Sequence, residues 1–72
     1  MLVDVRYSVF LTLDIPEEKL EAATHMESFE ERARAFQKLI AEADPAIEAF
    51  MRDHDNELCG ITDTEGYIYY EA

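Results

Sequence analysis

The spacing of apolar residues changes twice along these 72 residues, and each change marks a different kind of secondary structure. Residues 3–13 alternate between apolar and mainly polar side chains, residues 14–54 repeat at helical spacing, and alternation returns from residue 57. A period of two is typical of a half-buried strand, and a period near 3.6 of an amphipathic helix. The pattern therefore predicts the element order β-α-α-(α)-β-β.

The first alternating segment is the longest and is predicted to form one strand from residue 3 to residue 13. Phe10 is the exception on its polar side, and either it packs under a long neighbouring side chain or it marks a contact patch. The side expected to face the core consists of Val3, Val5, Tyr7, Val9, Leu11 and Leu13.

Two helix starts follow this strand. Asp14 precedes Glu17 by three residues, and Ser28 precedes Glu31 by the same interval. Each spacing is that of a capping box, in which the first side chain accepts a hydrogen bond from the backbone N–H of the third helical residue. With Pro16 in the first helical turn, we expect a short helix to about residue 24 and a longer one from residue 28.

The longer helix ends at a second start signal. Asp44 reads as the N-cap and Pro45 as the first residue of a third helix, because proline is well tolerated at that position. The expected inward stripes are Phe29, Ala33, Phe36, Leu39, Ile40 and Ala43, then Ile47, Phe50, Met51 and His54.

Residues 58–62 and 67–70 are predicted to form a C-terminal hairpin, in which Gly66 suits the left-handed position of the turn. Gly60 indicates a bulge or a close approach by another backbone. Within this hairpin the predicted core residues are Ile61, Ile68 and Tyr70, and the predicted outward residues are Tyr67 and Tyr69.

These elements predict one α+β domain spanning residues 1–72. We expect a three-stranded antiparallel sheet, with two to three helices inserted between strand 1 and the C-terminal hairpin and packed on one face. The last strand is expected beside the first, because a long unpaired strand would be marginal.

The charge of the chain restricts its partners. Seventeen Asp and Glu residues against six Lys and Arg give a formal net charge of −11. This sign disfavours direct binding to nucleic acid or to an anionic membrane, and it favours a basic protein partner. Selection for solubility alone would also enrich acids, but it predicts acids mixed with bases. Here the acids form two blocks, residues 14–31 and the segment after Arg52, which favours a functional acidic face.

No reactive constellation is evident in the sequence. His54 and Cys59 lie in an acidic segment without the paired Cys or His spacing of a zinc site, so neither a metal nor another cofactor is expected. Cys59 is predicted to be a buried, unreactive thiol within a strand. The chain is therefore not expected to be an enzyme. Its single cysteine and the absence of a leader pattern predict a cytoplasmic protein.

Tyr67 and Tyr69 offer a different kind of surface, because tyrosine is common in protein interfaces. If they point outward, the chain is an antitoxin-like or other protein-interaction module that binds through an aromatic or apolar patch. Cross-strand packing would account for the same residues.

In size, charge and expected layout the chain resembles small acidic proteins that phages encode against bacterial defence, especially anti-CRISPR proteins that act as DNA mimics. The group shares no sequence motif, and the resemblance covers the whole chain. It implies a monomeric inhibitor that occupies the DNA-binding surface of a CRISPR effector complex in the host cytoplasm. The residues expected to contact this partner are Glu17, Glu18, Glu21, Glu27, Glu30, Glu31, Asp53 and Asp55.

Overall fold

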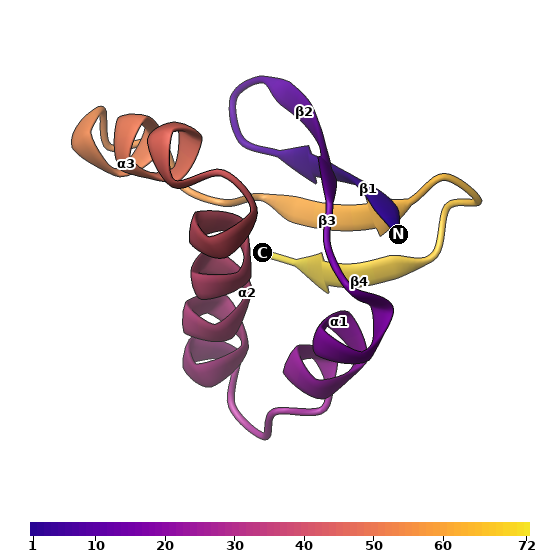
Figure 1. Cartoon of the computed structure of the whole chain (residues 1–72). Helices are drawn as coiled ribbons and strands as arrows, with labels where there is room; N and C mark the ends of the chain where they lie inside the picture. The colour runs from indigo at the N-terminus through magenta and orange to yellow at the C-terminus, as the bar shows by residue number, and fades with distance from the viewer.

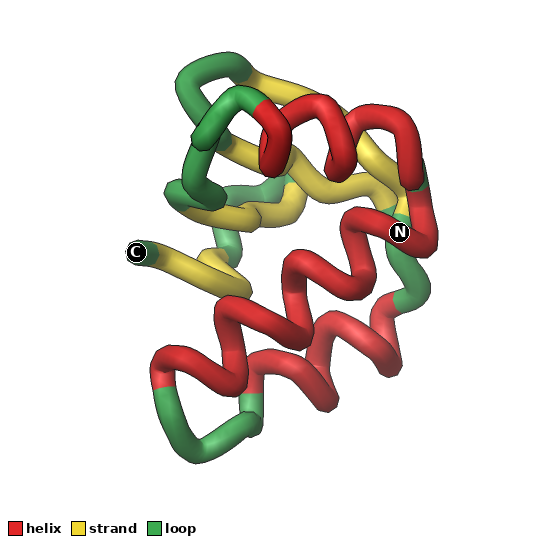
Figure 2. Tube along the Cα trace, turned by 90° about the vertical axis from the view of Figure 1, so that its left-hand side faces the viewer, coloured by secondary structure: helices red, strands yellow, loops and turns green.

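The computed structural model describes residues 1–72 and contains a four-stranded antiparallel sheet with three helices. The α+β class is confirmed, but the predicted number of three strands is wrong. Helices α1 and α2 lie side by side against one face of the sheet, and α3 lies beyond the strand ends (Figures 1 and 2). The elements are β1 (Leu2–Arg6), β2 (Phe10–Asp14), α1 (Glu17–Thr24), α2 (Phe29–Ala43), α3 (Pro45–Asp53), β3 (Gly60–Asp63) and β4 (Ile68–Glu71).

The fourth strand arises because residues 3–13 form a hairpin and not the single strand that was predicted. The chain reverses at residues 7–9, and β2 returns antiparallel to β1 with Val3 opposite Leu13 and Val5 opposite Leu11. Odd-numbered residues thus pair with odd-numbered ones. The apolar alternation runs through the turn without a break, which is why the sequence pattern did not reveal it.

The strand order is β2-β1-β3-β4, so the prediction that the last strand lies beside the first is also wrong. Strand β1 is central, with β2 on one side and β3 on the other, where Val5 faces Ile61. Strand β4 pairs only with β3 and forms one edge of the sheet. The second strand of the first hairpin occupies the place beside β1 that a three-stranded sheet would have left open.

A bulge changes which side chains of β4 are buried. Ile61 pairs with Tyr70, but the next residue of β3, Thr62, pairs with Ile68, so Tyr69 is an extra residue on β4. Two consecutive tyrosines are therefore buried, while Ile68 is 51% exposed. The predictions that Ile68 faces the core and that Tyr69 points outward are wrong, because both assumed uninterrupted alternation.

Local capping signals were right for two of the three helices. Ser28 Oγ accepts a hydrogen bond from the Glu31 N–H at 3.0 Å, which caps α2. Asp44 caps α3 through the Ile47 N–H at 3.2 Å, with Pro45 as the first helical residue. Each cap satisfies one backbone N–H of the first helical turn that has no partner within the helix.

The predicted cap of α1 is wrong. Asp14 ends β2, and its carboxylate lies 2.6 Å from the Met1 amino group. The residue before α1 is Pro16, which supplies no side-chain cap. The carboxylate that would have capped the helix is thus used in an ion pair at the end of the first hairpin.

The core lies between the sheet and α1 and α2. Phe36 and Ile40 of α2 and Leu20 of α1 are completely buried. The Tyr70 ring bridges the two layers, with centroids 5.6 Å from Phe29 and 5.4 Å from Phe36. None of the three helices combines the length and apolar composition needed to cross a lipid bilayer.

Residues at the start of β3 differ from expectation. Cys59 lies just before the strand and is exposed, so the prediction of a buried thiol is wrong. Its N–H donates to the Arg6 carbonyl at 2.7 Å. Gly60 does mark a close approach, but by a side chain: a Cβ at this position would collide with the Arg6 guanidinium.

Candidate acidic binding cleft

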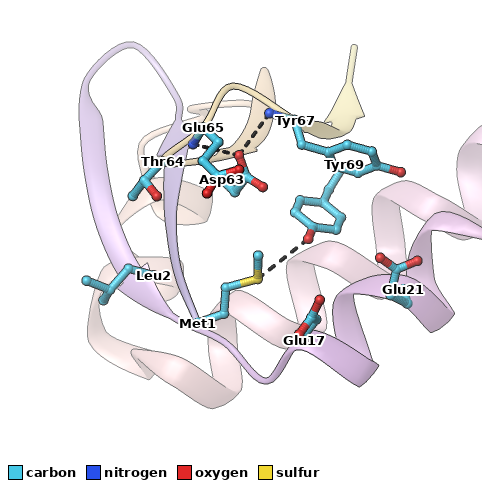
Figure 3. A pocket seen from close by; sticks show the side chains of 9 residues that line it. All are labelled: Met1, Leu2, Glu17, Glu21, Asp63, Thr64, Glu65, Tyr67 and Tyr69. Atoms are coloured by element: carbon cyan, nitrogen blue, oxygen red, sulfur yellow. Dashed lines mark hydrogen bonds between the residues drawn. The ribbon is translucent and has the colours of Figure 1, made fainter.

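An open cleft of about 610 Å³ lies between α1, the start of β1 and the turn that joins β3 to β4 (Figure 3). Four of its lining side chains are carboxylates, two from α1 and two from the turn, and none is Lys or Arg. The lining residues are Met1, Leu2, Glu17, Glu21, Asp63, Thr64, Glu65, Tyr67 and Tyr69.

Helix α1 presents its two cleft carboxylates because its other face is committed to the core. Leu20 and Ala23 are buried, which directs Glu17 and Glu21, one turn apart, toward the cleft. Like charges at this spacing oppose helix formation by roughly 0.2–0.5 kcal/mol. Packing of the apolar face of α1 offsets this cost, so the two carboxylates stay close together at a fixed place on the surface.

Asp63 fixes the other wall of the cleft. Its Oδ1 accepts hydrogen bonds from the backbone N–H groups of Glu65 and Tyr67, both at 2.8 Å (Figure 3). Gly66 completes the turn with φ of 93°, the left-handed conformation that was predicted for it. Asp63 Oδ2 makes no hydrogen bond within the chain, so this oxygen remains free to accept one from a ligand.

Two tyrosines from β4 and its turn form the floor and rim of the cleft. Tyr67 and Tyr69 meet edge to face with ring centroids 4.7 Å apart. Tyr67 is half exposed, whereas Tyr69 is only 5% exposed, and its O–H donates to the Met1 sulfur at 3.5 Å (Figure 3). An exposed aromatic ring beside carboxylates suits a cationic side chain, which gains both Coulomb and cation–π attraction.

The pKa of the Tyr69 phenol reflects the negative electrostatic potential inside the cleft. Its pKa is raised above 10.0, first by burial and then by the negative charges of Asp63, Glu21 and Glu17. Carboxylates from both walls therefore act on one point, because each disfavours a second negative charge on the phenol oxygen. The same field that disfavours phenolate favours an ammonium or guanidinium group.

Other reactive side chains lie apart from this cleft. His25 Nδ1 is 2.7 Å from the Glu21 carbonyl oxygen, and His54 Nδ1 is 2.8 Å from that of Phe50. The His54 ring also stacks on Phe50 at 4.1 Å. No group of three or more His, Cys, Asp or Glu side chains is placed to hold a metal ion.

The structure distributes the eight predicted contact residues over three places. Glu17 and Glu21 line the cleft, and Glu18 is on the same helix outside it. The acids around the start of α2 lie near the α1–α2 loop, and those at the end of α3 lie on the side of the molecule opposite the β3–β4 turn (Figure 1). These two outlying groups are Glu27, Glu30 and Glu31, and Asp53 and Asp55.

Asp63 and Glu65 were part of the second acidic block in the sequence, but they were not among the predicted contacts. Tyr67 and Tyr69 were considered only as an alternative apolar patch. The structure joins both features in one cleft because β4 packs beside α1. The sequence signal was the turn itself, in which two acids flank a tight reversal and an aromatic residue follows.

Comparisons with models of protein families, with curated proteins and with solved structures found no match to this chain.

Proposed function

We propose that the protein is an inhibitory binding protein that presents this cleft to a basic, nucleic-acid-binding partner and so blocks the partner's engagement of DNA. The observation that carries the proposal is the convergence of carboxylates from α1 and the β3–β4 turn in one concave surface without a Lys or Arg. Such a surface complements Arg and Lys side chains that otherwise contact phosphates.

Charge placement supports this function better than net charge alone. Lys19 is paired with Glu42 at 3.3 Å, and Arg52 with Glu48 at 3.4 Å, so these bases neutralise acids outside the cleft. The cleft acids are left with no ion-pair partner inside the chain. An incoming cation therefore need not displace an existing ion pair.

The partner class that we propose is a CRISPR effector complex, as the resemblance in size and charge implies. Such effectors read a short motif with Arg side chains and hold nucleic acid in positively charged channels. In this proposal the cleft and the adjacent Glu18 occupy the DNA-binding surface of the effector. Binding is expected to weaken steeply as the salt concentration rises, because the two partners carry opposite charges and salt screens their attraction.

The test uses guide-loaded, purified DNA-targeting effectors and a labelled target duplex, with fluorescence anisotropy measured at about 0.1 M and about 0.5 M salt. The parent chain should compete with the duplex at low salt and lose most of that competition at high salt. The double variant Glu17→Lys/Glu21→Lys should compete at least about tenfold less well.

The matched control is Glu27→Lys/Glu30→Lys, which changes the net charge equally but lies outside the cleft. Circular dichroism checks that both variants remain folded. If both variants lose competition to the same extent, total charge and not the cleft mediates binding. If no effector is inhibited, the proposed partner class is incorrect. The broader function is then tested by immobilising the protein and asking whether it retains basic proteins from bacterial lysate that duplex DNA releases.

A further inference from the structure

Strand β2 is an edge strand without the usual protection against pairing. Native proteins protect edges with charges, prolines, bulges or covering segments. Residues 7–13 contain no charged residue and no proline, and the register with β1 is regular throughout. Phe10, at the start of the strand, is 78% exposed. Thr12 is also exposed, and the charged residue at the end of the strand, Asp14, is paired with the Met1 amino group.

The opposite edge of the sheet has an irregular backbone and more negative charge. Strand β4 contains the bulge at Tyr69, which interrupts the regular ladder. Its terminal Glu71 is in no ion pair, unlike Asp14 of β2, and Asp63 and Glu65 lie at the turn before it. An approaching strand would meet both an irregular backbone and negative charge there. The sheet therefore has one protected and one unprotected edge.

Hydrogen bonds at the two ends of the first hairpin show which groups of β2 are free. The Tyr7 N–H donates to the Val9 carbonyl, and the Ile15 N–H donates to the Met1 carbonyl, both at 2.9 Å. Antiparallel pairs alternate between bonded and non-bonded. Odd-numbered residues of β2 therefore bond to β1, and the N–H and C=O groups that point outward are those of Phe10, Thr12 and Asp14.

We propose that β2 pairs antiparallel with β2 of a second copy of this chain, which joins two sheets into one of eight strands. In the two-fold symmetric register Thr12 lies opposite Thr12 of the second copy, and Phe10 lies opposite Asp14. All outward backbone groups are then paired, and no two carboxylates face each other. A basic partner would be attracted instead to the acidic cleft, so an edge whose only carboxylate, that of Asp14, is already paired fits another copy best.

This association is expected to be weak and to strengthen with salt. A pair of five-residue strands buries less than the roughly 1,200 Å² of a stable interface. Two copies, each with a net charge of −11, also repel each other until salt screens them. The salt dependence is therefore opposite in sign to that of the proposed complex with a basic partner, and the two contacts are distinguishable.

The experiment is sedimentation velocity of the full chain from about 10 µM to about 1 mM, at low and high salt. The parent should shift from monomer toward dimer with concentration, and more so at high salt. Phe10→Lys adds a charge to the edge, and Thr12→Pro removes an outward N–H, so each should raise the dimer dissociation constant about tenfold or more.

Ile68→Lys is the matched control, because it makes the same change in charge at an exposed apolar residue of the other edge. It should dimerise like the parent, and thermal unfolding checks that all variants fold. A parent that stays monomeric at about 1 mM and high salt overturns the proposal. Equal loss of the dimer in Ile68→Lys overturns it as well. So do NMR amide chemical shifts that change with protein concentration at residues outside β2.

Discussion

Asp63 combines a structural and an electrostatic role in a single side chain. One carboxylate oxygen accepts the two backbone N–H groups that shape the β3–β4 turn. Its negative charge is also the largest electrostatic contribution to the raised pKa of Tyr69, after burial. The two roles are separable by substitution, because an amide oxygen accepts hydrogen bonds without carrying charge.

Asp63→Asn is expected to keep the turn and to lower the pKa of Tyr69 toward its ordinary value, since one nearby negative charge is removed. Asp63→Ala should lower that pKa too, but it also leaves two N–H groups without their acceptor and destabilises the fold by about 1–2 kcal/mol. Ultraviolet absorbance titration of the phenols and urea unfolding measure the two effects. Equal unfolding free energies for the two variants would contradict the structural role.

At the scale of single elements, the sequence predicted what is decided locally. The caps at Ser28 and Asp44 depend on residues three positions apart, and both helices start where expected. The first hairpin was missed because its register pairs odd residues with odd residues and its turn contains no Gly, Pro, Asn or Asp. The Tyr69 bulge was missed for a related reason, since it inserts one residue without any sequence marker.

The cap of α2 offers a direct test at this scale. Ser28→Ala removes the acceptor of the Glu31 N–H and should lower the free energy of unfolding by about 1 kcal/mol. Ser8→Ala, in the turn of the first hairpin, removes an exposed hydroxyl with no hydrogen bond in the structure and should stay within about 0.5 kcal/mol of the parent. Chemical denaturation measures both. A loss in Ser8→Ala as large as in Ser28→Ala would contradict the capping argument.

For the whole molecule, the candidate site is a product of tertiary packing. Glu21 and Asp63 are far apart in sequence and share a cleft only because β4 packs beside α1. The sequence did indicate two acidic blocks, yet it did not indicate which members of the blocks meet. The sequence also did not indicate that the acids at the end of α3 lie on the side of the molecule opposite the cleft turn, because this depends on how α3 is placed relative to the sheet.

Alkaline stability is a property of the whole fold that follows from its buried phenols. Burial raises the pKa of Tyr7, Tyr69 and Tyr70 above 10.0 in the folded state. In the unfolded chain these phenols lose their protons near pH 10, while the folded state still retains them. Their contribution to stability is therefore complete below about pH 10 and is lost as the pH rises through the folded-state pKa values.

Urea unfolding from about pH 9 to about pH 11 should accordingly show a falling free energy of unfolding above about pH 10. Tyr7→Phe keeps the buried ring and removes one ionisable group, so its decline with pH should be shallower than that of the parent. The difference between the two slopes gives the contribution of the Tyr7 phenol. Parallel curves for parent and Tyr7→Phe would contradict the assignment.

The bulge in β4 has an optical consequence. It places two successive rings in different surroundings, with Tyr70 stacked on the half-exposed Phe29 and tilted against the buried Phe36, and Tyr69 in the acidic cleft. The chain has four tyrosines and no tryptophan, so two of its four intrinsic fluorophores, Tyr67 and Tyr69, line the cleft. A guest that lacks aromatic residues would thus change the emission of the unlabelled protein directly, without any attached dye.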